Sequence, residues 1–174
     1  MIAGLLLLLF AAFGCTISEH FITDASYRAR VEADFKTKRE AFADSSLFAI
    51  FQTEMTTPER EAMEFLYAYM PIGDVADYDG AFYLRNVRAS FTARREMPWG
   101  QQIPEDIFRH FVLPIRVNNE NLDESRTVFF EELKDRVRGL SLREAVLEVN
   151  HWCHEKVIYT PSDARTSSPL ASVC

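Results

Sequence analysis

Helix-forming patterns run almost without a break from Phe21 to about Val157, and this continuity constrains the fold more than any other feature of the chain. Apolar residues recur there at the three- and four-residue spacing of an amphipathic helix. The six Gly and seven Pro fall mostly at the apparent ends of these segments. Fourteen Phe and six Tyr supply enough aromatic surface for a packed core. The sequence therefore predicts a folded, mainly α protein.

Local start and stop signals divide this region into separate helices. Thr57 is expected to cap the third helix, with Pro58 at its first helical position. Gly139 is expected to end the next-to-last helix. Ser141 and Glu144 form a capping box at the start of the last one. The expected helices lie at about 24–42, 47–55, 57–70, 79–95, 104–112, 127–138 and 142–156.

The last predicted helix leads into a different kind of segment. Its buried side is expected to carry apolar residues and one thiol, namely Leu142, Ala145, Val146, Val149, Trp152 and Cys153. Val157–Tyr159 is β-prone, and a polar loop is expected at 160–169. Residues 117–123 are predicted to form another polar loop.

The N-terminus is interpreted as a targeting segment. Ile2–Phe13 is apolar or small throughout, and the first charge is Glu19. This run is too short for a membrane-spanning helix, which needs about 20 residues, and it fits the apolar region of a secretory signal. It ends in a segment, AFGC, that resembles a bacterial lipoprotein processing site. We expect residues 1–14 to be a lipoprotein-type signal peptide and Cys15 to be lipidated, which would anchor an exported protein to a membrane of the bacterial cell envelope, on its periplasmic or surface side. A plain signal peptide or a short anchor is the alternative.

The charge balance argues against a nucleic-acid partner. The net charge is −7, whereas nucleic-acid binders present a basic face that displaces counterions. Basic and acidic side chains are interleaved over residues 28–40, as on a solvated helix face. A second basic cluster, Arg85–Arg88 with Arg94–Arg95, is interpreted as surface or interdomain and is assigned no function.

No metal site and no cofactor site are predicted. His151, Cys153 and His154 lie within one helical turn, but Cys153 points away from the two His residues and no second ligand cluster is apparent. Cys153 is expected to be a buried, inert thiol, although a disulfide with Cys174 is possible. The run Asn118–Asn121 lacks the spacing and the Gly of a calcium loop, which favours a polar turn.

Two pairs of carboxylates and one tryptophan are candidate catalytic or binding groups. Asp77 with Asp79, or Glu131 with Glu132, would provide the carboxylate pair of a glycosidase. Nothing in the sequence marks these acids as buried or opposed, so exposed acids are expected. Trp99 lies in a turn between Pro and Gly, where it could stack on a sugar or peptide or anchor the core.

The segment Glu144–Cys174, EAVLEVNHWCHEKVIYTPSDARTSSPLASVC, resembles the lead-in to the catalytic cysteine of transglutaminase-like proteins. In that family of papain-fold thiol acyltransferases and hydrolases, a helix with a tryptophan, an extended segment with a Tyr and a Ser/Pro loop precede a Gly-x-Cys motif. Residues 94–126 are similar to the helical region before the catalytic domain in secreted bacterial members. The resemblance implies a helical region at 15–139. It also implies that the first helix and strand of a truncated α+β, papain-like domain lie at 140–174.

The resemblance also implies that the catalytic Cys, His and Asp lie beyond Cys174. Ser172 and Val173 precede Cys174 where the family has its glycine motif, so Cys174 is expected to be a loop residue. The chain would then be the inactive N-terminal part of an enzyme that acts on amides of a protein or peptide substrate. The alternative is a complete small helical lipoprotein that binds protein or glycan in the cell envelope.

Overall fold

The computed structural model describes residues 25–116, 120–156 and 169, and within these ranges all regular structure is helical, with no strand. The prediction of a mainly α fold is confirmed for this part of the chain. The predicted strand at Val157–Tyr159 lies outside the described residues. The elements are α2 (Ala25–Ala41), the 3-10 helix η1 (Ser46–Gln52), α3 (Thr57–Tyr69), α4 (Ile72–Asp77), α5 (Gly80–Glu96), the 3-10 helix η2 (Gly100–Gln102), α6 (Glu105–Ile107), the π-helical turn η3 (Phe108–Val112), α7 (Ser125–Val137) and α8 (Leu142–Lys156).

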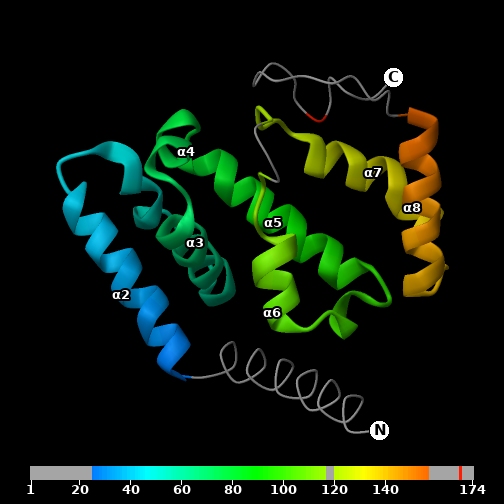
Figure 1. The fold of residues 1–174 in the computed structure, drawn as a ribbon, viewed down its shortest axis with the longest axis horizontal. Coiled ribbons are helices and arrows are strands. Elements are labelled where there is room, and N and C mark those ends of the chain that lie inside the picture. The colour runs from blue at the N-terminus through cyan, green and yellow to red at the C-terminus, as the bar shows by residue number, and fades with distance from the viewer. Residues whose placement is uncertain (1–24, 117–119, 157–168, 170–174) are drawn as a thin grey trace, which may run out of the picture.

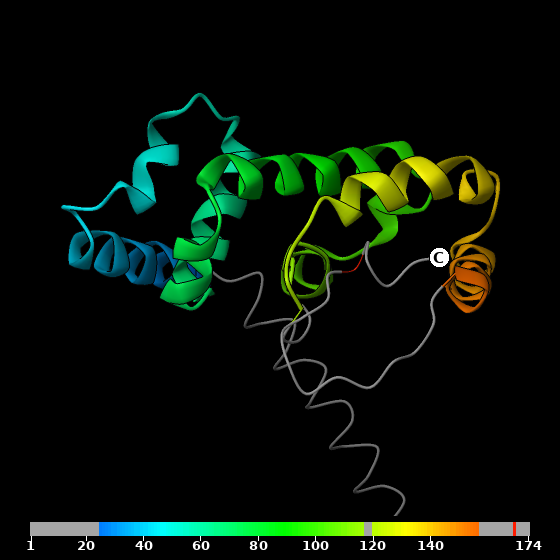
Figure 2. The same cartoon turned by 90° about the horizontal axis from the view of Figure 1, so that it is seen from above.

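The helix α5 joins the two ends of the molecule (Figure 1). At one end it packs on α3 and η1, and α3 in turn packs on α2. At the other end α7 lies alongside α5, and α8 crosses the end of α7 (Figure 2). None of the described helices combines the length and apolarity needed to cross a bilayer.

The main core lies between α2, η1, α3 and α5 and is rich in aromatic rings. The helix α2 contributes Tyr27, Val31 and Phe35, which are spaced four residues apart and share one face, as its apolar pattern predicts. The Phe35 and Phe51 rings are 4.7 Å apart, and the Phe51 and Tyr67 rings meet edge to face at 5.1 Å. These offset and edge-to-face contacts are the geometries that aromatic rings prefer.

Side-chain caps begin several helices, and one lies a residue earlier than predicted. Thr56, in place of the predicted Thr57, caps α3 and forms a capping box with Glu59. The Thr56 amide donates to Glu59 Oε2 at 2.9 Å, and the Glu59 amide donates to Thr56 Oγ1 at 3.4 Å. Thr57 is already helical, because Thr56 has the extended backbone that a cap requires.

The capping box at α8 is confirmed. The Ser141 amide donates to Glu144 Oε2 at 2.9 Å, and the Glu144 amide donates to Ser141 Oγ at 3.4 Å. Asp79 caps α5 in the same way, accepting a 2.6 Å hydrogen bond from the Phe82 amide. The expected start of α5 at Asp79–Gly80 is therefore confirmed.

Several boundaries differ from the predicted ones. The helix α4 forms after Pro71, where no helix was predicted, and the expected 104–112 helix is a short α6 followed by the π-helical turn η3. The helix α7 ends at Val137, and none of the described glycines has positive φ. Arg138 caps α7, so the helix stops directly before Gly139, as predicted, although Gly139 does so without a left-handed backbone.

Gly100 is required by close packing of the backbone. A Cβ atom at this position would lie 2.0 Å from the carbonyl oxygen of Arg94 and 2.7 Å from its carbonyl carbon. The turn after α5 folds back against the last turn of that helix, so any side chain at residue 100 would force the two segments apart.

A second, smaller cluster joins α7 and α8 to the end of α5. Met97, Val137 and Ala145 are buried in it, with Trp99 and Val149 packed against them. Trp99 therefore contributes to packing, as one of its two predicted roles required.

The apolar stripe of α8 is only partly covered in the described structure. Ala145 and Trp152 are buried as predicted, but Leu142 is 41% exposed and Val146 is 60% exposed. The prediction that these two are buried is wrong for this part of the chain. The surface of α8 that meets α7 is centred on Ala145 and Trp152, and Leu142 and Val146 lie at its margin.

Candidate functional site

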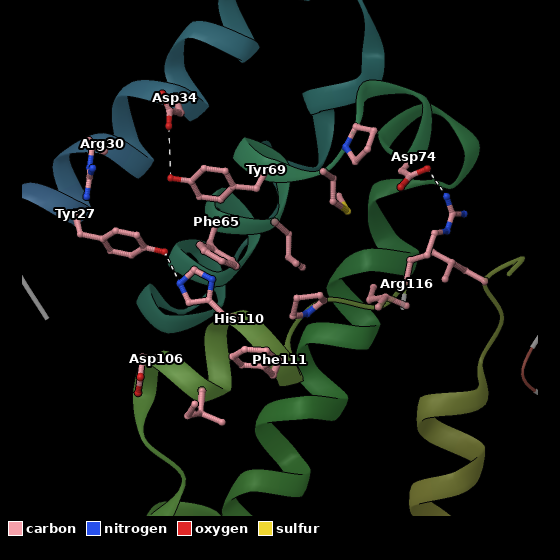
Figure 3. A pocket seen from close by; sticks show the side chains of 17 residues that line it. Tyr27, Arg30, Asp34, Phe65, Tyr69, Asp74, Asp106, His110, Phe111 and Arg116 are labelled. Carbon is pink, nitrogen blue, oxygen red and sulfur yellow. Dashed lines mark hydrogen bonds and ion pairs between the residues drawn. The ribbon is translucent and has the colours of Figure 1, made fainter. Parts of the chain in front are cut away.

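A pocket of about 970 Å³ lies between α2, α3, α4 and the η3 turn, and it is the candidate binding site of the described structure (Figure 3). Its size falls within the range of ligand pockets in proteins, about 300–1,000 Å³. The residues that line it are mostly aromatic and aliphatic, with a few charged groups. They are Tyr27, Arg30, Asp34, Phe65, Leu66, Tyr69, Met70, Pro71, Asp74, Asp106, Ile107, His110, Phe111, Pro114, Ile115, Arg116 and Leu122.

Two tyrosines and a histidine bring polar groups into this pocket. Tyr27 Oη lies 3.0 Å from His110 Nε2, and the Phe65 ring meets the His110 ring edge to face at 5.2 Å (Figure 3). Tyr69 Oη donates to Asp34 Oδ2 at 3.4 Å. Burial raises the pKa of Tyr27, and burial followed by the Asp34 carboxylate raises the pKa of Tyr69. Both phenols therefore stay protonated at neutral pH, and their oxygens can accept a hydrogen bond from a ligand.

An ion pair fixes the opposite end of the pocket. Arg116 donates to the Asp74 carboxylate, with both side chains largely buried, and the Tyr83 hydroxyl donates to the Asp74 carbonyl. These bonds hold α4 and the segment after η3 against α5. A largely buried pair of this kind sets geometry more than it adds stability.

The mouth of the pocket is apolar and open. Phe111 is 77% exposed, and Tyr69 and Ile107 are 49% and 41% exposed. Exposed rings beside convergent polar groups are typical of binding surfaces. The lining contains no Cys, Ser, Thr or Lys that could act as a nucleophile with His110 as its base.

The two cysteines most important to the sequence predictions, Cys15 and Cys174, lie outside the described residues. Cys153 has a free thiol that is half-buried, so the prediction that it is buried is wrong, because its side chain lies at the margin of the surface that α8 packs on α7. His151 Nε2 lies 3.1 Å from Glu155 Oε1 on the exposed side of α8. Within the described ranges no three His, Cys, Asp or Glu side chains gather in a way that could hold a metal ion.

The carboxylates weighed as glycosidase pairs have structural partners. Asp79 caps α5, and Glu131 pairs with Lys134. Glu132 accepts a 2.9 Å hydrogen bond from Trp152 Nε1 and pairs with Lys156 at 3.3 Å. Of the predicted polar loop Asn118–Asn121, residues 118 and 119 lie outside the described structure.

The main residues of the pocket were not identified from the sequence. His110 appeared isolated there, because its partner Tyr27 is 83 positions away and on a different helix. The available signal was Ile107 and Phe111, two apolar residues four positions apart in the expected 104–112 helix, which place an apolar face near its end.

Comparisons with known proteins give no relative for this chain. No family model matches it, no curated protein matches it, and no solved structure matches it.

Proposed function

We propose that this chain is the helical N-terminal part of an exported, transglutaminase-like cysteine acyltransferase or hydrolase that acts on amides of proteins or peptides. In this proposal α8 is the first helix of the catalytic domain. The catalytic Cys, His and Asp belong to chain beyond Cys174, so residues 1–174 alone have no activity. In the full protein a thiolate attacks the amide carbonyl carbon, the amine leaves with a proton, and the thioester passes its acyl group to an amine or to water.

The observation that carries this proposal is the partly covered apolar stripe of α8. The helix has a complete capping box, and Trp152 is anchored on α7, so its position is well defined. Leu142 and Val146 nevertheless remain exposed. Among the described residues, the cluster beside them has three buried members, Met97, Val137 and Ala145, which is small for an independent domain core. A helix with one anchored side and one open apolar side is what the first helix of a larger domain requires.

The test compares Val146→Asp in residues 1–174 and in the product of the reading frame continued past Cys174. In the short chain the change should alter the free energy of unfolding by no more than about 0.5 kcal/mol, because Val146 is exposed. In the longer protein it should cost more than about 3 kcal/mol, because it would bury a charge. His151→Asp, at an exposed position on the side of α8 away from Val146, is the matched control and should be tolerated in both. An equally small effect of Val146→Asp in both proteins contradicts the proposal.

Export and lipid anchoring through Cys15 form a second part of the proposal. The apolar run Ile2–Phe13 followed by the AFGC segment supports it. In a bacterial host, cells fed an alkyne fatty acid should yield a labelled protein in the membrane fraction. Cys15→Ser should abolish the label and Cys153→Ser should keep it. Unlabelled chain that retains Met1 in the cytosol refutes this part.

The pocket between α2, α3 and η3 favours a second candidate function, a module that binds protein or glycan of the cell envelope. Its support is the exposed ring of Phe111, which lines the same pocket as the Tyr27–His110 pair. Insoluble peptidoglycan is a direct probe, because bound protein sediments with it. Phe111→Ala should reduce this binding, whereas Val128→Ala, which truncates an exposed apolar side chain outside the pocket, should not. Equal sedimentation of both variants argues against this function.

A further inference from the structure

Three of the α5 arginines that the sequence left without a role, Arg88, Arg94 and Arg95, line a second pocket of about 830 Å³. It lies on the side of α3 where Pro58 and Glu61 lie. Five guanidinium groups and three carboxylates line it, a local excess of two positive charges in a chain whose net charge is −7. The arginines come from α2, α5 and η3. They are Arg28, Arg88, Arg94, Arg95 and Arg109.

Three of these guanidinium groups are held by carboxylates. Arg109 pairs with Glu61 at 3.2 Å and with Glu105 at 2.8 Å. Arg94 pairs with Glu105 at 2.6 Å, and Arg88 pairs with Glu59 at 2.9 Å. Burial alone would raise the pKa of Glu105, but hydrogen bonds from Arg94 and Arg109 hold it below its usual value. This wall of the pocket is therefore rigid and remains positively charged around an ionised carboxylate.

The other two arginines are available to a ligand. Arg28, in the first turn of α2, makes no hydrogen bond or ion pair with the part of the chain that the structure describes. Arg95 donates only to Thr92 Oγ1, at 3.3 Å, among the described residues. Both side chains are exposed and line the same pocket from different helices.

The floor of this pocket is apolar. Ala62 and Leu113 are buried there, and Phe91 is half-buried. Arginine is suited to phosphate and carboxylate groups because its planar fork donates two parallel hydrogen bonds to them. An anion held by the guanidinium groups of Arg28 and Arg95 within the pocket would lie close to this apolar floor.

We propose that this pocket binds an oxyanion, the phosphate or carboxylate of a small organic acid or of a lipid headgroup, through the guanidinium groups of Arg28 and Arg95 that line it from different helices. The Glu61–Arg109–Glu105–Arg94 network forms its fixed wall. The site is separate from the Tyr27–His110 pocket, and its occupancy does not depend on any catalytic residue.

The test uses the full chain with Arg28→Gln and Arg95→Gln together. The control carries Arg85→Gln and Arg143→Gln, which remove the same charge from exposed positions outside the pocket. Inorganic phosphate is titrated by NMR at about physiological ionic strength, where screening limits nonspecific attraction. In parallel, cosedimentation is measured with phosphatidylcholine vesicles that contain or lack phosphatidylglycerol. Far-UV circular dichroism checks that both double variants remain folded, as expected for exposed side chains.

The pocket variant should bind phosphate at least about tenfold more weakly than the wild type, because two charge-assisted contacts are lost, while the control changes less than about twofold. Phosphate binding without a difference in vesicle binding identifies a soluble anion as the ligand. A loss of phosphatidylglycerol binding confined to the pocket variant identifies a lipid headgroup. Any vesicle binding by residues 2–13 is common to all variants. Equal binding by the two double variants in both assays overturns the proposal.

Discussion

Two fully buried tyrosines in the main core should respond in opposite ways to the loss of their hydroxyl groups. Tyr67 and Tyr83 are both 0% exposed, and their rings meet edge to face at 5.9 Å. The Tyr67 hydroxyl has no hydrogen-bond partner within the described structure, whereas the Tyr83 hydroxyl donates to the carbonyl of Asp74. Substitution by Phe keeps each ring in place and removes only the hydroxyl.

The expected magnitudes follow from these partners. Tyr67→Phe removes a buried polar group that makes no bond, so it should raise the free energy of unfolding by about 1 kcal/mol. Tyr83→Phe leaves the Asp74 carbonyl without its donor and should lower the free energy of unfolding by about 1–2 kcal/mol. Each variant is thus the control for the other, because the chemical change is identical.

Alkaline pH should enlarge the difference between Tyr67→Phe and the wild type. Burial, followed by the charge of Asp79, raises the pKa of Tyr67 from 10.0 to about 12. Between these values the unfolded phenol loses its proton while the folded one keeps it, so the wild type loses stability as pH rises. From pH 9 to pH 11 this loss amounts to about 1.3 kcal/mol for this one group, and the Phe variant does not suffer it. The other tyrosines titrate alike in both proteins and cancel in the difference.

The assay is urea unfolding followed by far-UV circular dichroism at pH 9 and pH 11, with all three proteins measured together. The reasoning is refuted if Tyr67→Phe lowers stability by 1 kcal/mol or more at pH 9. It is equally refuted if the advantage of Tyr67→Phe over the wild type does not grow between the two pH values.

Three further predictions test the local structure by equilibrium unfolding. Thr56→Ala should cost about 1 kcal/mol by removing the cap of α3, and Thr57→Ala should cost less because Thr57 is not the cap. A larger effect of Thr57→Ala would show that Thr57 is the cap instead. Gly100→Ala should cost about 1–3 kcal/mol because its Cβ meets the Arg94 carbonyl, while Gly139→Ala should be neutral or slightly stabilising; equal effects would contradict the packing at Gly100. Trp152→Phe should cost about 1–3 kcal/mol through the lost bond to Glu132 and the lost ring area, and an unchanged midpoint would show that α8 is not anchored on α7.

The sequence predicted those features that depend on neighbouring residues. The cap at Ser141 needs only a short polar side chain and an amide three positions away, and it is where it was expected. The helix α5 likewise begins at the predicted position, with Asp79 as its cap. The cap of α3 was placed one residue late, because Thr56 and Thr57 are chemically alike and only the backbone geometry separates them. Periodicity correctly identified the buried face of α2.

Features that depend on distant partners could not be predicted. His110 meets Tyr27 only because α2 and the η3 turn pack across α3, and no local pattern encodes that approach. The apolar stripe on α8 is a second example. The spacing of its residues indicates which side of the helix is apolar, but not how much of that side is covered by other elements. Leu142 and Val146 satisfy the pattern and still remain exposed.

The central proposal, that these residues introduce a transglutaminase-like catalytic domain, is tested most directly by assaying the product of the reading frame continued past Cys174. We expect this longer protein to incorporate a fluorescent primary amine into a glutamine-containing protein, or to release ammonia from it, and to lose that activity after treatment with iodoacetamide. Residues 1–174 alone should show neither reaction. A stop codon directly after Cys174, or a longer protein without thiol-dependent amide chemistry, contradicts the proposal.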